Sequence, residues 1–150
     1  MSSVAMPSTV AITNLLYRYA ELMDAGDFEG AAAMFEHADL ILDHDTDTRT
    51  DAAGILEIWR SLVIVHDDGT PRTKHVTTNP IVEVDEALGT ATCRSYYTVL
   101  QQLGDGPLVP IVAGRYHDRF ERVADEWRFS ERDYSMMDLV GDVSRHLRQR

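Results

Sequence analysis

Apolar residues recur every three or four positions in the first third of the chain and alternate with polar residues later. In the first segment the apolar positions are Ile12, Leu15, Leu16, Tyr19, Leu22 and Met23. This spacing predicts an amphipathic helix, and Gly26 is placed to end it. Asp27 is a suitable N-cap for a second, shorter helix with the sequence FEGAAAMF.

A strand and a third helix are predicted next. The stretch ADLILD has strand-like character, and Thr50 can cap the helix that follows it. The buried stripe of this helix is expected to contain Ile55, Leu56, Ile58, Trp59, Leu62 and Val63. At the other end of the chain, residues from Met136 onward are expected to form a terminal helix that ends in RHLRQR.

Residues that are β-branched or aromatic dominate the second half of the chain and indicate strands. The four predicted strands are TKHVTTNPIVEV, TATCRSYYTVLQQL, PLVPIVAGRYHDRFERV and EWRFSERDYS. The turn sequences EALG, GDGP and VADE separate them. Such short connections predict an antiparallel meander in which neighbouring strands pair.

Helices followed by an antiparallel sheet are typical of an α+β fold. The chain has 150 residues and 44% hydrophobic content, which suits one domain that spans residues 1–150. We therefore predict a cone-shaped α+β barrel, with the N-terminal helices packed on a curved mixed or antiparallel sheet. The mouth of the cone is where a small-molecule pocket is expected.

Charge and cysteine content exclude several classes of protein. Lys and Arg number 14 against 25 Asp and Glu, so the net charge is −11, which opposes binding to nucleic acid. Cys93 is alone and can form neither an internal disulfide nor a cysteine metal site. No secretory segment or bilayer-spanning apolar run is evident, so we expect a cytoplasmic protein without a membrane partner.

Asp24 and His75 are the first candidates for chemistry. Asp24 lies in the last turn of the first predicted helix, where the helix dipole disfavours its charge. It shares a stripe with Tyr17 and can point partly inward, whereas its position in the sequence alone favours a solvated loop aspartate. Strand alternation places His75 on a polar face with Thr73, where an exposed structural histidine is the alternative to a catalytic one.

Other candidates lie on the later strands. Ser95 and Tyr97 share one strand face that would suit either a cavity wall or an ordinary core, and Tyr97 could orient a substrate oxygen. Arg132 is expected on the surface, because strict alternation sets it opposite Trp127 and Phe129. Only a bulge would let Arg132 and these aromatic residues face one interior.

The acidic stretch DHDTDT resembles the start of a calcium-binding loop only weakly. Thr48 stands where such a loop has its turn glycine, and Gly54 stands where it has its closing glutamate. We interpret this stretch as a solvated acidic turn. The sequence also lacks HExxH, GxGxxG, P-loop and GxSxG motifs, so no metal or organic cofactor is predicted.

Taken together, three stretches resemble the SnoaL-like branch of the nuclear transport factor 2-like superfamily. They are ITNLLYRYAELMDAGDFEGAAAMF, TKHVTTNPIVEV and AGRYHDRFERVADEWRFSER. The resemblance covers roughly residues 8 to 135, and the branch includes polyketide cyclases, scytalone dehydratase and a hexachlorocyclohexane dehydrochlorinase. It implies a dyad of an aspartate that closes the first helix and a histidine that opens the second strand. Asp24 and His75 match these positions, and Arg132 matches an arginine that follows a W-x-F motif in the dehydrochlorinase.

The chain also departs from these relatives. Tyr19 stands where the dehydrochlorinase has a lysine, and no histidine stands near Ser95 to Tyr97, where scytalone dehydratase has its second one. Neither substrate can therefore be carried over. Tyr17, Tyr19, Ser95 and Tyr97 are our candidates for binding a substrate.

The function implied by this resemblance is a cofactor-independent lyase that acts on a small hydrophobic or cyclic substrate. In this reading His75 removes a carbon-bound proton, Asp24 stabilises the imidazolium, and Tyr97 or Arg132 stabilises negative charge. An isomerase or polyketide cyclase with the same dyad is an alternative, and so is a noncatalytic binding module or dioxygenase small-subunit-like module. A homodimer or homotrimer is expected.

Overall fold

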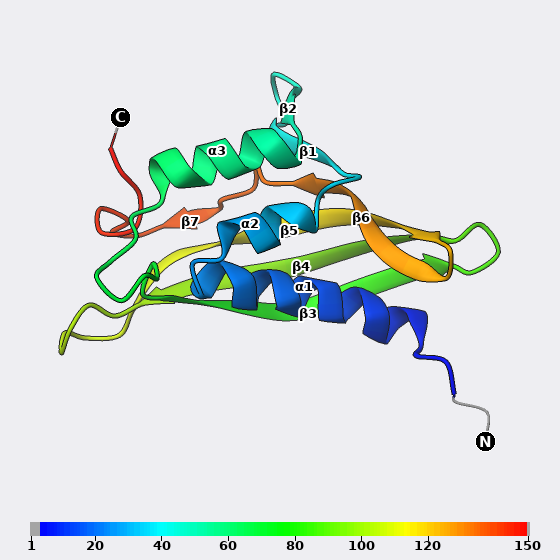
Figure 1. Ribbon diagram of the computed structural model, residues 1–150, viewed down its shortest axis with the longest axis horizontal. Coiled ribbons are helices and arrows are strands. Elements are labelled where there is room, and N and C mark those ends of the chain that lie inside the picture. The colour runs from blue at the N-terminus through cyan, green and yellow to red at the C-terminus, as the bar shows by residue number, and fades with distance from the viewer. Residues whose placement is uncertain (1–3, 150) are drawn as a thin grey trace.

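The computed structural model describes residues 4–149, which form helices packed on one curved, unclosed sheet (Figure 1). Within these residues the helices are α1 (Ser8–Asp24), α2 (Phe28–Ala33) and α3 (Ala52–Leu62). The strands are β1 (Asp39–Asp43), β2 (Thr48–Thr50), β3 (Thr73–Asp85), β4 (Thr90–Gln101), β5 (Val109–Val123), β6 (Glu126–Asp133) and β7 (Leu139–Val140). The predicted α+β class is confirmed.

Local capping signals explain where the helices begin and end. Gly26 has a φ of 76°, a conformation that glycine adopts without strain, and it follows Ala25, the C-cap residue of α1. The Asp27 carboxylate accepts a hydrogen bond from the Gly30 amide at 2.9 Å and caps α2, as predicted. Asp51 caps α3 by accepting from the Gly54 amide. The predicted cap, Thr50, is wrong by one residue because it is the last residue of β2.

The sheet has the strand order β2-β1-β6-β5-β4-β3. Strands β3 to β6 form the predicted antiparallel meander, while β1 joins β6 in parallel and makes the sheet mixed. The prediction of a helix after residue 136 is wrong, because this segment contains the short strand β7. Val112 and Ala113 lie beyond the part of β5 that pairs with β6, and β7 pairs with these two residues instead.

Two bulges change which side chains face the interior. The register between β5 and β6 passes from Arg119↔Glu131 to Phe120↔Phe129, so Ser130 is an extra residue in β6. As a result both Phe129 and Arg132 are buried, which strict alternation would forbid. The pairing of β3 with β4 also shifts between residues 78 and 81.

The core lies between the helices and the inner face of the sheet. Figure 1 shows α1 running along β3, with α2 beside α1 and α3 beside α2. Side chains from α1, α3 and strands β4 to β6 form one buried cluster that is rich in aromatic rings. No helix among residues 4–149 has the length and apolar character needed to cross a bilayer.

Candidate functional site

The end of α1 and the beginning of β3 bring Asp24 and His75 together. The side chains of Asp24 and His75 are only 9% and 10% exposed. His75 Nδ1 lies 2.6 Å from Asp24 Oδ1. An ionised carboxylate only accepts hydrogen bonds, so Nδ1 carries the proton and donates it, which leaves Nε2 as the free acceptor of the ring.

Two further donors fix the carboxylate of Asp24. The Thr73 hydroxyl donates to Oδ1 at 3.0 Å, and the backbone amide of His75 donates to Oδ2 at 2.8 Å. Three hydrogen bonds therefore hold Asp24 in one orientation. They also offset the cost of placing a negative charge at the C-terminal end of a helix.

One aromatic side chain, Tyr19, contacts the dyad, and further tyrosines extend from it across the inner side of the sheet. The Tyr19 ring meets the His75 ring edge to face, with centroids 6.5 Å apart. The Tyr134 hydroxyl donates to the Tyr19 hydroxyl at 3.0 Å. Tyr97 stacks on Tyr116 at a centroid distance of 4.3 Å. The core next to Tyr19 is therefore made of ring faces and carries phenol groups at its edges.

The guanidinium of Arg132 lies among these rings. Its Cζ atom is 3.8 Å from the centroid of Tyr116 and 4.5 Å from that of Tyr19. Nε and Nη2 donate to the two carboxylate oxygens of Asp118 at 2.7 and 3.1 Å. Both side chains are fully buried. Burial opposes the charge of Arg132, but the adjacent Asp118 raises the pKa of Arg132 well above the usual arginine value.

Burial also keeps the phenol groups protonated. It raises the pKa of Tyr97 to about 12 and raises the pKa values of Tyr19 and Tyr116 above that of free tyrosine. At neutral pH these hydroxyls are therefore neutral and able to donate hydrogen bonds.

Three buried polar atoms have no hydrogen-bond partner within residues 4–149. They are Ser95 Oγ, Arg132 Nη1 and His146 Nδ1. Ser95 pairs in register with Tyr116, and Tyr116 lies against Arg132, so the first two atoms belong to the same aromatic surroundings. Buried polar groups are normally satisfied, so each of these orphaned atoms calls for an explanation.

The structure brings together most of the predicted site residues. Asp24, His75, Tyr19 and Arg132 form one connected series of contacts, and Tyr97 joins them through its stack on Tyr116. Tyr17 does not join them, because it lies on the outer side of α1 and is 42% exposed.

Four residues of this region were not predicted from the sequence. Tyr116, Asp118 and Phe120 occupy every second position of β5 and are all buried on one face. The period-two pattern of that strand could therefore have indicated Tyr116 and Asp118. Tyr134 follows the end of β6, and His146 lies in an irregular segment, so neither position has a periodic signal.

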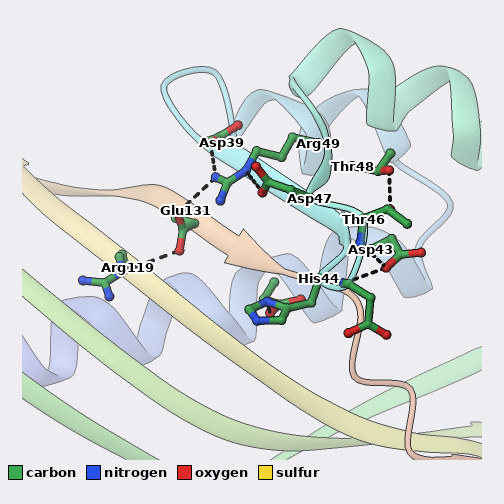
Figure 2. A network of polar contacts seen from close by, with 11 residues as sticks. Asp39, Asp43, His44, Thr46, Asp47, Thr48, Arg49, Arg119 and Glu131 are labelled. Carbon is green, nitrogen blue, oxygen red and sulfur yellow. Dashed lines mark hydrogen bonds and ion pairs between the residues drawn. The ribbon is translucent and has the colours of Figure 1, made fainter.

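The acidic stretch between β1 and β2 satisfies its own charges (Figure 2). The Asp43 carboxylate accepts hydrogen bonds from the amides of Asp45 and Thr46, and Arg49 pairs with both Asp39 and Asp47. Within residues 4–149, no three histidine, cysteine, aspartate or glutamate side chains are grouped so that they could hold a metal ion.

Comparison with known proteins places the chain in a family. Residues 5–133 match the model described as the SnoaL-like domain. No curated protein sequence matches the chain significantly.

Solved structures show the same fold. An NTF2-like protein with a cystatin-like fold from Novosphingobium aromaticivorans is 20% identical, with 87% of this chain and 82% of that chain covered and a TM-score of 0.67. A candidate scytalone dehydratase from the same organism is 19% identical, with 83% and 80% covered and a TM-score of 0.61. The beta subunit of a candidate aromatic-ring-hydroxylating dioxygenase, also from that organism, is 18% identical, with 91% and 94% covered and a TM-score of 0.65.

Proposed function

Since the chain belongs to the SnoaL-like domain family, we propose that it is a cofactor-independent lyase for a small hydrophobic or cyclic molecule. The observation that carries this proposal is the part-buried hydrogen bond of 2.6 Å between His75 Nδ1 and Asp24 Oδ1. This bond leaves Nε2 of His75 as a proton acceptor and supplies a counter-charge for the imidazolium that forms when it takes a proton.

The proposed reaction is the loss of water from a β-hydroxy carbonyl compound. Nε2 of His75 removes a proton from the carbon next to the carbonyl, and the electron pair of that C–H bond becomes the new C=C bond. The bond to the hydroxyl group on the next carbon breaks, and the imidazolium of His75 returns its proton to the departing oxygen. Water leaves, and the dyad is restored.

Negative charge develops on the carbonyl oxygen of the substrate during this proton transfer. Nη1 of Arg132, buried and without a partner within residues 4–149, is the proposed donor to that oxygen. The hydroxyl of Tyr97 is protonated at neutral pH and is a second candidate donor. The aromatic surroundings of Tyr19 and Tyr116 support a cyclic substrate, because ring faces pack well against one another.

The competing enzyme functions use the same proton abstraction. An isomerase returns the proton to another carbon, and a polyketide cyclase closes a ring. A noncatalytic module has no need of the dyad, and for that function we would expect Asp24 and His75 to lie more than about 4 Å apart, outside hydrogen-bond reach. Their separation of 2.6 Å favours the enzyme.

A dehydration assay with 3-hydroxycyclohexanone in D₂O tests the proposal. Mass spectrometry follows deuterium exchange next to the carbonyl, and absorbance follows the conjugated ketone. We expect His75→Ala and Asp24→Asn to abolish both signals, while His117→Ala, a change of an exposed histidine on β5, leaves them intact. Unchanged exchange in both dyad variants would contradict the assignment. Exchange without loss of water would favour an isomerase.

The homodimer or homotrimer also stays a prediction. Strands β3 and β4 carry exposed apolar side chains that a second copy could cover, namely Val76, Ile81 and Tyr96. Light scattering on the purified protein measures the stoichiometry.

A further inference from the structure

His146 is a buried histidine that the dyad does not use. Its ring belongs to the segment after β7, and the residue is only 8% exposed. Nδ1 has no hydrogen-bond partner within residues 4–149. A buried ring nitrogen without a partner is unfavourable, so its position calls for an explanation.

Hydrogen bonds anchor this segment to β4, the strand that pairs with β3. The Ile64 amide donates to the His146 carbonyl at 2.8 Å. The side-chain amide of Gln101 donates to the carbonyl of the preceding residue, Arg145, at 3.2 Å. Gln101 is paired in register with Thr73, whose hydroxyl binds Asp24. The chain of contacts therefore leads from His146 to the carboxylate of the dyad.

Three ionisable groups from separate elements act on the His146 ring. Burial lowers the pKa of His146 to about 4, His75 on β3 and His66 in the loop before β3 lower it as well, and Asp24 on α1 raises it. The ring is therefore neutral at neutral pH, and one of its nitrogens can accept a hydrogen bond.

We propose that His146 is a second imidazole of the Asp24–His75 site, and that its Nδ1 accepts a hydrogen bond from a hydroxyl group of the bound molecule. The inference rests on the proposed function in one respect, namely that the bound molecule is the substrate on which Asp24 and His75 act. A hydroxyl group satisfies the orphaned nitrogen, and the Tyr19 ring, which meets the His75 ring, packs against the carbon skeleton that carries this hydroxyl.

Proximity of the two imidazoles is tested first, without any ligand. Histidine ring signals are followed by NMR as the pH is lowered, in the wild type and in His75→Asn. Since His75 lowers the pKa of His146, its removal should raise that pKa, whereas His117→Asn on the outer face of β5 should leave it unchanged. An unchanged pKa of His146 in His75→Asn would overturn the inference.

Binding is tested with phenol, which carries one hydroxyl on a ring, and with toluene, which has a similar shape without it. We expect phenol to shift the His146 ring signal and His146→Leu to weaken phenol binding about threefold to tenfold, as for the loss of one hydrogen bond. The same substitution should change the affinity for toluene less than the affinity for phenol. His146→Asn keeps a polar atom near the position of Nδ1 and should restore part of the phenol affinity.

Two results would overturn the proposal. One is the lack of any phenol-dependent shift of the His146 signal, and the other is equal phenol affinity in the wild type and His146→Leu, as expected if an ordered water satisfies Nδ1. Neither measurement uses turnover. Full dehydration activity in His75→Ala would therefore refute the proposed function without touching the role of His146, and the two failures stay distinguishable.

Discussion

Two arginine–aspartate pairs in this protein have nearly the same geometry and very different surroundings. Arg132 donates to both oxygens of Asp118 at 2.7 and 3.1 Å, with both side chains fully buried. Arg115 donates to both oxygens of Asp138 at 2.8 and 3.1 Å, with side chains 42% and 39% exposed. The chain therefore contains its own control for the effect of burial on an ion pair.

We predict that Asp118→Asn lowers the free energy of unfolding by about 3–5 kcal/mol, because it leaves the buried guanidinium of Arg132 without a counter-charge. For a chain of this length such a loss lowers the melting temperature by roughly 6–20 °C. Asp138→Asn makes the same chemical change in a pair that water screens, so its effect on stability should be small.

Urea and thermal unfolding followed by circular dichroism measure both variants. The double variant Asp118→Leu with Arg132→Met removes both buried charges at once and should be more stable than Asp118→Asn alone. Equal losses for Asp118→Asn and Asp138→Asn would refute the reasoning. A double variant less stable than Asp118→Asn would also contradict it.

Three further predictions concern acid stability, packing and the dyad. Burial lowers the pKa of His146 from 6.5 in the unfolded chain to about 4 in the folded protein, so the free energy of unfolding should decrease as the pH falls from 6.5 toward 4. When unfolding is measured at both pH values, this decrease should be roughly 3 kcal/mol larger in the wild type than in His146→Leu. Gly114→Ala would drive a β-carbon into the Met136 carbonyl and should cost about 1–3 kcal/mol, which urea titration would detect and an unchanged midpoint would contradict. Thr73→Val removes one of the three donors to Asp24 and should slow deuterium exchange about threefold to tenfold, and an unaltered rate would argue against a role for this hydrogen bond.

Local signals in the sequence were sufficient for most of the fold. Gly26 and Asp27 mark the boundary between α1 and α2, because a positive φ and an N-cap depend on residues next to one another. The strands from β3 to β6 were predicted equally well, since their turns are short and leave little choice of partner. The parallel addition of β1 to β6 was not specified, because the two strands are far apart in the sequence.

The interior position of Arg132 could not be read from periodicity. Phe129 and Arg132 are three positions apart, so an unbroken strand would direct their side chains to opposite faces. The extra residue, Ser130, restores a common face, and a bulge of this kind depends on pairing with β5 rather than on the local sequence. His146 was missed for a related reason, since its neighbours come from Ile64 and from β4, far away in the chain.

The position of the dyad follows from the open edge of the sheet. Strand β3 is the last strand in the sheet order, so on its outer side the backbone has amides without a strand partner. The amide of His75 is one of them, and it donates to Asp24 instead. Because α1 ends at this edge, a single carboxylate both satisfies the edge amide and orients the imidazole. Asp24→Asn keeps an oxygen for the amide but loses the charge, so a fold that survives this change together with a lost reaction would separate the structural role of Asp24 from its chemical one.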